Sequence, residues 1–204
     1  LSEPASRGET MTERQYGDCL EHVVLPYSQA SAYTHCGTPY MVGALARMNL
    51  ARERLHPATR VDAAETLTMF PSTNIFHNNL AQAIEVLHAV DDALEIFRTT
   101  TFVPEPIQKM SPRTATGIGV VEAPRGTLYH TITTDAHGVV TSGAVVVPTG
   151  QNQLNMEADI ARLVEEHIAA GTPRERIEFE LEKLIRAYDP CMSCAAHFLK
   201  VAWA

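Results

Sequence analysis

Two cysteines and a histidine lie within seven positions near the end of this 204-residue chain, in the segment 189–197 with the sequence DPCMSCAAH. Thiolates separated by two residues can bind one soft metal ion, and an imidazole three positions later can bind at the same place. An ordinary chain end is polar and frayed, but the residues that follow this histidine are apolar: Phe198, Leu199, Val201 and Trp203. The segment therefore predicts a C-terminus that folds inward and closes a buried metal site.

A C-x-x-C pair has other uses, and the sequence around this one disfavours three of them. A thioredoxin-like redox motif needs a strand-to-helix junction inside a βαβ unit, and here the chain continues for only ten residues past Cys194. Covalent haem attachment needs a histidine directly after the second cysteine, where this chain has Ala195. A zinc knuckle needs a fourth ligand, which no nearby C-x-x-C or histidine pair supplies. The remaining alternative is that the two cysteines lie in a hydrophobic core by chance and bind no metal.

The composition restricts the partners and the compartment. The formal net charge of −8 disfavours nucleic acid as a partner, because phosphate contacts need a basic surface. No apolar run reaches the roughly 18–20 residues of a membrane span, and the N-terminus lacks the apolar core of a secretory signal. Four cysteines without a disulfide-like pattern indicate a reduced protein, so we expect a cytoplasmic location. Cys19 and Cys36 have no partner at a meaningful spacing and are expected to be buried thiols.

The length fits a single domain, residues 1–204, of which the polar residues 1–16 are expected to be flexible. Residues 16–50 have a mixed pattern that predicts strands and loops. A helix is expected from about Thr59 to Thr66, and a longer one after the turn-forming segment PSTN at 71–74. In the longer helix, apolar residues recur at helical intervals over about two dozen residues: Leu80, Ile84, Leu87, Leu94 and Phe97.

The second half of the chain predicts a hairpin and two helices. Residues 126–148 alternate like two strands around the turn sequence DAHG at 135–138. One helix is expected after Asn155 as N-cap. The last helix has Thr172 as N-cap, Pro173 as its first residue and Glu175 to complete a capping box. It should end at about Tyr188, because Pro190 cannot continue a helix, and its apolar stripe is Ile177, Leu181, Leu184 and Ile185. The expected fold is α+β, mainly helical with a small antiparallel β element.

The pattern D-P-C-x-x-C-x-x-H at 189–197 resembles the C-terminal signature of the nickel-iron hydrogenase large subunit. Two further blocks resemble the same family, in the same order: EAPRGTLYH at 122–130 and PTGQN at 148–152. The segments 42–49 (VGALARMN) and 78–85 (NNLAQAIE) are similar to the cytoplasmic branch. The resemblance covers residues 20–197, and three ordered blocks make it more specific than any one of them.

The resemblance implies a nickel-iron centre with cyanide and carbonyl ligands on the iron. Cys191 would be a terminal thiolate on nickel, and Cys194 a thiolate that bridges nickel and iron. His197 would bind a magnesium-type ion near the C-terminus. Soft sulfur suits both metals of the centre, and metal binding keeps the thiols deprotonated.

The resemblance also implies the residues around the metals. Arg125 would hold its guanidinium over the open coordination position, with Pro124 in the same wall. Thr149, after Pro148, would donate a hydrogen bond to a cyanide on iron, and Asp189 would orient Arg125 as its ion-pair partner. Each has a plainer alternative in the residues themselves, because Arg125 could be a structural ion pair and Thr149 a turn cap. Two further residues of the blocks are expected to be structural: His130 makes a hydrogen bond in the core, and Glu122 is a surface or paired charge.

This sequence departs from the family pattern in two places. The large subunit is much longer and carries a second C-x-x-C near its N-terminus, so the missing N-terminal half would supply the other two thiolates. Family precursors are cut after the final histidine by a maturation peptidase, whereas residues 198–204 are present here as a removable tail. We therefore expect the chain to be the C-terminal half of a larger or split subunit, without a complete centre and inactive when isolated.

The function implied is reversible heterolytic cleavage of dihydrogen by an oxidoreductase, with electrons passed to an iron-sulfur small subunit. A nicotinamide- or deazaflavin-linked module is a further expected partner. Two alternatives are a non-catalytic hydrogenase-derived subunit and a metal-binding assembly or storage module, for which Cys191, Cys194 and His197 would suffice.

Overall fold

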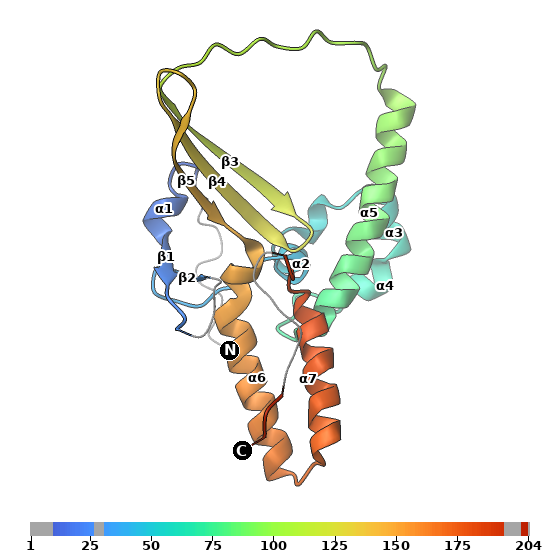
Figure 1. Cartoon of the computed structure of the whole chain (residues 1–204). Helices are drawn as coiled ribbons and strands as arrows, with labels where there is room; N and C mark the ends of the chain where they lie inside the picture. The colour runs from blue at the N-terminus through green and yellow to red at the C-terminus, as the bar shows by residue number, and fades with distance from the viewer. Residues whose placement is uncertain (1–9, 27–30, 194–200, 204) are drawn as a thin grey trace.

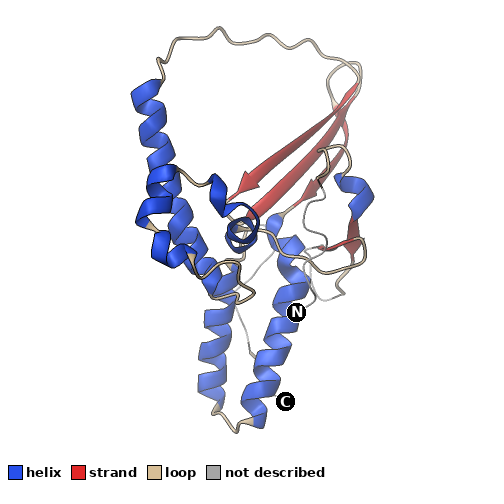
Figure 2. Ribbon diagram, turned by 180° about the vertical axis from the view of Figure 1, so that it is seen from behind, coloured by secondary structure: helices blue, strands red, loops and turns tan. Residues whose placement is uncertain are grey.

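The computed structural model describes residues 10–26, 31–193 and 201–203, and it has the expected α+β architecture (Figure 1). A three-stranded sheet lies on one side of the molecule, and the long helix α5 (His77–Thr99) lies on the other. Seen from behind (Figure 2), residues 100–114 connect the two without helix or strand. Within the described residues, no helix is both long and apolar enough to cross a bilayer.

The sheet contains the predicted hairpin and one strand more. Strands β3 (Ala115–Ala123), β4 (Gly126–Thr134) and β5 (Val140–Val146) pair antiparallel in chain order. The turn between β4 and β5 is the predicted one, since the Asp135 carboxylate accepts backbone N–H bonds from His137 and Val139 at 2.8 and 3.0 Å. Ala123 pairs with Gly126, so residues 124–125 form a two-residue loop between β3 and β4.

A second, smaller hairpin lies near the N-terminus. The short helix α1 (Tyr16–Cys19) leads into β1 (Leu20–Val23), which pairs antiparallel with β2 (Ala32–His35). Strand β2 packs against the start of helix α6 (Pro148–Ala169). The predicted strands and loops of residues 16–50 are therefore correct only for the described residues between α1 and Gly43, because residues 16–19 are helical.

Residues 44–51 form helix α2 (Ala44–Ala51), which corrects the prediction of strands and loops there. Leu45 and Met48 are one helical turn apart and both are buried against α5, so a tertiary contact decided the conformation. After the 3-10 turn η1 (Arg52–Arg54), the helix predicted near 59–66 is divided into α3 (Pro57–Asp62) and α4 (Ala64–Leu67). Helix α5 confirms the prediction of a long helix, although Leu94 and Phe97 at its far end are exposed.

The two closing helices form an antiparallel pair (Figure 1). Helix α6 begins at Pro148, not after Asn155 as predicted. Proline is favoured at the first position of a helix, and Pro148 occupies that position. Asn155 lies inside this helix and its amide donates to the Tyr40 carbonyl at 2.6 Å. Helix α7 (Arg174–Tyr188) ends where predicted. The predicted capping box does not form. The N-cap is Pro173, no side chain caps the helix, and the Thr172 hydroxyl lies 3.1 Å from the His167 ring.

Two apolar clusters hold these elements together. One joins α2 to α5 through the buried residues Ala44, Leu45, Met48, Leu55, Ala63, Phe70, Ala81 and Ile84. The other joins α7 to the segment before α5 through Ile75, Leu184, Ala187 and Tyr188, with Met156, Ile160 and Leu163 of α6 packed against it. Ile177 and Leu181 of the predicted stripe are also buried, and Ile185 is half-buried. The second cluster fixes the direction in which α7 ends.

Replacing Gly150 by alanine is expected to lower the free energy of unfolding by about 1–2 kcal/mol, as overpacking does. A methyl group there would lie 2.3 Å from the backbone carbonyl oxygen of Ser31, so β2 would have to move away from α6. Gly119→Ala is the matched control, because a methyl group at Gly119 meets nothing within 4 Å. Urea unfolding of both variants measures the difference. Equal stabilities would contradict the close approach of β2 and α6.

Candidate metal centre

The end of α7 delivers Cys191 to a defined place. Asp189 caps the helix in the left-handed region, with a φ of 50°, and Pro190 then prevents further helix. The Tyr188 hydroxyl donates to an Asp159 carboxylate oxygen at 2.6 Å, which ties the last turn of α7 to α6. Burial, and next the hydrogen bond to Asp159, raise the pKa of Tyr188 above its usual value, so this donor keeps its proton.

Asp189 is held from two directions. The Arg125 guanidinium, from the loop between β3 and β4, lies 3.2 Å from a carboxylate oxygen of Asp189 and donates through Nε to its backbone carbonyl at 3.0 Å. The Gln82 amide of α5 donates to the other carboxylate oxygen at 2.9 Å. The pair that the family resemblance implied is therefore formed, and two N–H groups of Arg125 fix the plane of the guanidinium.

Thr149 meets Cys191 directly. Its hydroxyl accepts the backbone N–H of Cys191 at 3.1 Å, and its side chain is buried in the first turn of α6 behind Pro148. A hydroxyl that accepts one hydrogen bond still has its own proton to donate. The Cys191 sulfur is half-buried and lies 3.2 Å from the Ser193 hydroxyl.

The structure thus brings together the predicted residues that it describes. Arg125 and Thr149, from two different elements, both contact the segment that runs from Asp189 to Cys191. Pro124 precedes Arg125 in the same loop, and Pro148 precedes Thr149. Cys194 and His197 lie outside the described residues. Glu122 is a paired charge, as predicted, since it contacts Arg47 and accepts the Thr127 hydroxyl proton at 2.7 Å.

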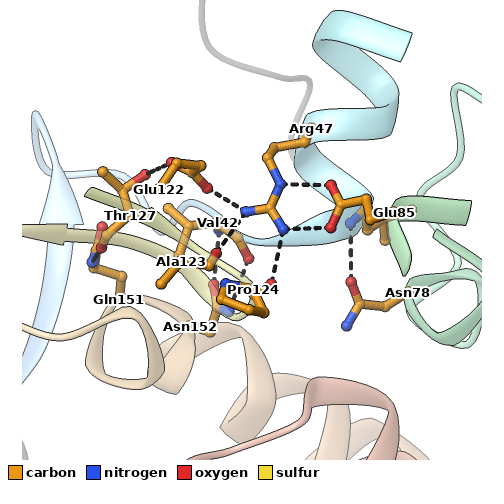
Figure 3. Close-up of polar contacts among 11 residues, drawn as sticks. Val42, Arg47, Asn78, Glu85, Glu122, Ala123, Pro124, Thr127, Gln151 and Asn152 are labelled. Atoms are coloured by element: carbon orange, nitrogen blue, oxygen red, sulfur yellow. Dashed lines mark hydrogen bonds and ion pairs between the residues drawn. The ribbon is translucent and has the colours of Figure 1, made fainter. Parts of the chain in front are cut away.

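Arg47 of α2 holds the loop that carries Arg125 (Figure 3); it lies in the block 42–49 that contributed to the resemblance, but no sequence pattern predicted this role. Its Nε and Nη2 each lie 2.6 Å from Glu85 of α5, and Nη1 contacts Glu122. It also donates to the carbonyls of Ala123 at 3.0 Å and Pro124 at 2.8 Å. Burial alone would lower the pKa of Arg47, but the hydrogen bonds and charges of Glu85 and Glu122 raise it overall. Arg47 therefore stays charged and joins three elements beside a cavity of about 620 Å³.

Side-chain amides fix the backbone around the same loop (Figure 3). Asn152 of α6 accepts the Val42 N–H at 2.8 Å and donates to the Val42 carbonyl at 3.0 Å. Gln151 donates to the Thr127 carbonyl at 2.7 Å. Asn78 accepts the Leu45 N–H at 2.9 Å and donates to the Ala187 carbonyl at 2.8 Å, so it links α2 to the end of α7. Asn78, Gln151 and Asn152 belong to the blocks that carried the resemblance, which was their only signal in the sequence.

The expected burial of Cys19, Cys36 and His130 is wrong. Cys36 is exposed and Cys19 is only half-buried, because both lie at the open end of the small β1–β2 hairpin. His130, expected to make a hydrogen bond in the core, is exposed on β4, since the sheet leaves much of its surface uncovered. The thiols of Cys19 and Cys36 lie close to the imidazole of His35, a grouping that the sequence analysis missed.

The described residues fit one side of the expected nickel-iron centre. Cys191 offers soft sulfur, Thr149 offers a hydroxyl proton beside it, and Asp189 engages only part of the five N–H donors of Arg125. Two thiolates from the terminal segment cannot fill the four-thiolate set of such a centre. The remaining thiolates would have to come from another segment.

A model of the family described as nickel-dependent hydrogenase matches residues 3–197. The chain is 29% identical over 199 residues to the alpha subunit of sulfhydrogenase 1 from Pyrococcus furiosus, which covers 97% of this chain and 46% of that protein. It is 32% identical over 206 residues to the beta subunit of the NAD-reducing hydrogenase HoxS from Cupriavidus necator, covering 92% of this chain and 41% of the relative. The chain thus spans less than half the length of these curated relatives.

Among solved structures, a NAD⁺-reducing NiFe-hydrogenase in the H2-reduced state superposes with a TM-score of 0.70 at 27% identity. The superposition covers 91% of this chain and 43% of that one. A nickel-iron-selenium hydrogenase from Desulfomicrobium baculatum superposes with a TM-score of 0.56 at 20% identity, which is a likeness of fold alone.

Proposed function

The chain belongs to the nickel-dependent hydrogenase family, and we propose that it supplies Arg125 and the C-terminal thiolates to the nickel-iron centre of such an enzyme. The reaction proposed is the reversible heterolytic cleavage of dihydrogen, with electrons passed to an iron-sulfur small subunit. One observation carries the proposal: Arg125 and Thr149, which come from different elements, both contact the segment that presents Cys191.

In this proposal the chain holds the metals with sulfur. Cys191 and Cys194 would hold the nickel-iron pair as thiolates, and His197 would bind a magnesium ion near the C-terminus. When bound, the nickel-iron pair acts as a Lewis acid that makes dihydrogen acidic enough to lose a proton. The thiolates must lose their protons before the metals bind, so metal retention should weaken as the pH falls.

The neighbouring side chains have positioning roles. Arg125 is held by Asp189 through two contacts, which restrict its guanidinium so that it would lie over the open position of a bound centre. Pro124 forms part of the same wall. Thr149 accepts from the Cys191 N–H and would donate its own proton to a cyanide of a centre that carries cyanide and carbonyl ligands on iron.

The centre is completed by other chains or segments. A second C-x-x-C, in the N-terminal half of the catalytic subunit, would provide the other two thiolates. A maturation peptidase would cut after His197 and remove residues 198–204. The location proposed is the cytoplasm, and the isolated chain is proposed to be inactive.

Metal analysis of the assembled enzyme tests the proposal. The chain, tagged at its N-terminus and purified from its own cells with the chains that accompany it, is expected to contain nickel and iron in equal amounts. Infrared bands of cyanide and carbonyl should accompany them. Cys194→Ala is expected to remove both metals and the bands. Zinc alone, or no metal, would contradict the proposal and favour the metal-binding module or the non-catalytic subunit.

A further inference from the structure

Three metal-binding side chains lie together far along the chain from the C-terminal thiolates. The sulfur atoms of Cys19 and Cys36 and a ring nitrogen of His35 all lie within 4.8 Å of one another. We propose that these three residues bind a thiophilic divalent metal ion, with Zn²⁺ as the first choice, at the open end of the β1–β2 hairpin. None of these three residues belongs to the set proposed above for the nickel-iron centre.

Strand pairing places the two cysteines opposite each other. Leu20 pairs with His35 in the antiparallel register of β1 and β2. The next step of the ladder is the hydrogen bond from the Cys36 N–H to the Cys19 carbonyl, at 2.9 Å. Directly opposite residues of an antiparallel pair have neighbouring side chains. The backbone register therefore places the two thiols close together.

A tight turn brings His35 to the same place. Adjacent residues in a strand point to opposite faces, so His35 and Cys36 could not both reach one ion if the strand continued. Cys36 leaves the strand with a φ of 48°, and Gly37 follows with a φ of 76°. Two hydrogen bonds between His35 and Thr38, at 2.9 and 3.0 Å, close the turn. Turns with two successive positive φ values favour Gly, Asn and Asp. Cys36 is therefore in a strained backbone conformation, and in that conformation its sulfur lies beside Cys19 and His35.

The imidazole is supported from the other side. The His35 ring contacts the Tyr40 ring edge-on, with 6.0 Å between the centroids, and the Tyr40 hydroxyl donates to Gln151 of α6 at 2.9 Å. This support restricts the His35 side chain before any ion is bound. Outer contacts of this kind orient metal-binding histidines in general.

The donor set determines the ion. Two thiolates and one neutral imidazole are typical ligands of Zn²⁺, and a tetrahedral ion would have its fourth position left for water or an external ligand. Cys36 is exposed, so solvent can reach that position. On binding, two S–H bonds break and their protons go to the buffer, while two Zn–S bonds and one Zn–N bond form. No electron is transferred.

The ion would strengthen a weak part of the fold. Strands β1 and β2 have four residues each, and a two-stranded hairpin of this size is only marginally stable by itself. The metal would clamp the open end of the hairpin, opposite the connection between the strands. Because β2 packs against the start of α6, this clamp would also support the turn that carries Thr149.

A cobalt titration tests the proposal in the full chain. The background variant Cys191→Ser/Cys194→Ser removes the C-terminal thiols, so any thiolate binding must come from Cys19 and Cys36. The reduced protein is expected to bind one equivalent of Co²⁺ with a thiolate-to-cobalt charge-transfer band, which Zn²⁺ then displaces. Cys19→Ser or Cys36→Ser in this background should weaken binding by more than about a hundredfold, and His35→Ala by at least about tenfold.

The matched control is His22→Ala, because His22 lies on β1 of the same hairpin and outside the cluster. It should bind Co²⁺ like the background variant. In the unmutated chain, Zn²⁺ should protect Cys19 and Cys36 from alkylation, which mass spectrometry measures without relying on a folded variant. Binding that requires Cys191 or Cys194, the absence of binding and protection, or a Cys19–Cys36 disulfide that binds no metal after reduction would each overturn the proposal.

Discussion

Replacing Arg47 by methionine is expected to lower the free energy of unfolding by about 2–4 kcal/mol. Methionine has a similar length but no donor, so Glu85 would lose its partner and the carbonyls of Ala123 and Pro124 would lose their N–H groups. The exposed fractions of the Arg47 and Glu85 side chains are 24% and 20%, so water replaces these bonds only partly. The Glu122 contact adds less, because that side chain is 43% exposed. Denaturant unfolding of the full chain measures the loss.

Arg52→Met is the control for this prediction. Arg52 is also only partly exposed, but its ion pair with Glu53 is long, at 3.9 Å. Its replacement should change the free energy of unfolding by less than about 0.5 kcal/mol. If Arg47→Met and Arg52→Met were equally stable, the network around the loop of residues 124–125 would not have the structural role assigned to it.

Arg125→Lys should leave nickel and iron bound in the assembled enzyme and reduce dihydrogen turnover by about a hundredfold or more, the usual effect of one misplaced polar group at a reacting centre. Lysine can replace the charge but cannot hold the Asp189 carboxylate and carbonyl with one planar group. The ammonium would therefore not stay over the open position. Metal content, infrared bands and hydrogen-uptake rates of the same preparation test the three parts of this expectation.

Arg162→Lys is the matched control. Arg162 also forms an ion pair with an aspartate, Asp159, at 2.7 Å, and its exposed fraction of 55% is close to the 45% of Arg125. Its replacement should preserve both metals and turnover. Loss of metal from Arg125→Lys would show that the residue is structural, and full turnover with bound metals would show that its guanidinium is dispensable.

Several elements of the fold could be predicted from local signals. The end of α7, the turn at Asp135 and the long helix α5 follow from a proline, an Asx-type turn and an apolar repeat, each of which acts over a few neighbouring residues. The segment before α5 was predicted less well. Helix α2 has a weak local pattern, and it forms because Leu45 and Met48 can be buried against α5.

The candidate site divides in the same way. Its membership was predicted from three blocks whose likeness to one family identified Arg125, Thr149 and Cys191. The role of Arg47 was not predicted. Its partners Glu85 and Glu122 lie 38 and 75 positions away, and no local rule relates residues at such separations. The Cys19–His35–Cys36 grouping was missed for a related reason. The spacing of Cys19 and Cys36 has no meaning until the register of β1 and β2 makes them neighbours.

The sequence by itself determined the family, the presence of the long helix α5, the end of α7 and the point where Cys191 leaves the last helix, because apolar repeats, prolines and motif order act at short range. Only the tertiary structure decided that Thr149, 42 positions before Cys191, accepts its N–H, and that Arg125 Nε, 64 positions before Asp189, donates to the Asp189 backbone carbonyl in addition to the expected ion pair. Such contacts depend on how the sheet, α6 and α7 pack together, and that packing is a property of the whole fold.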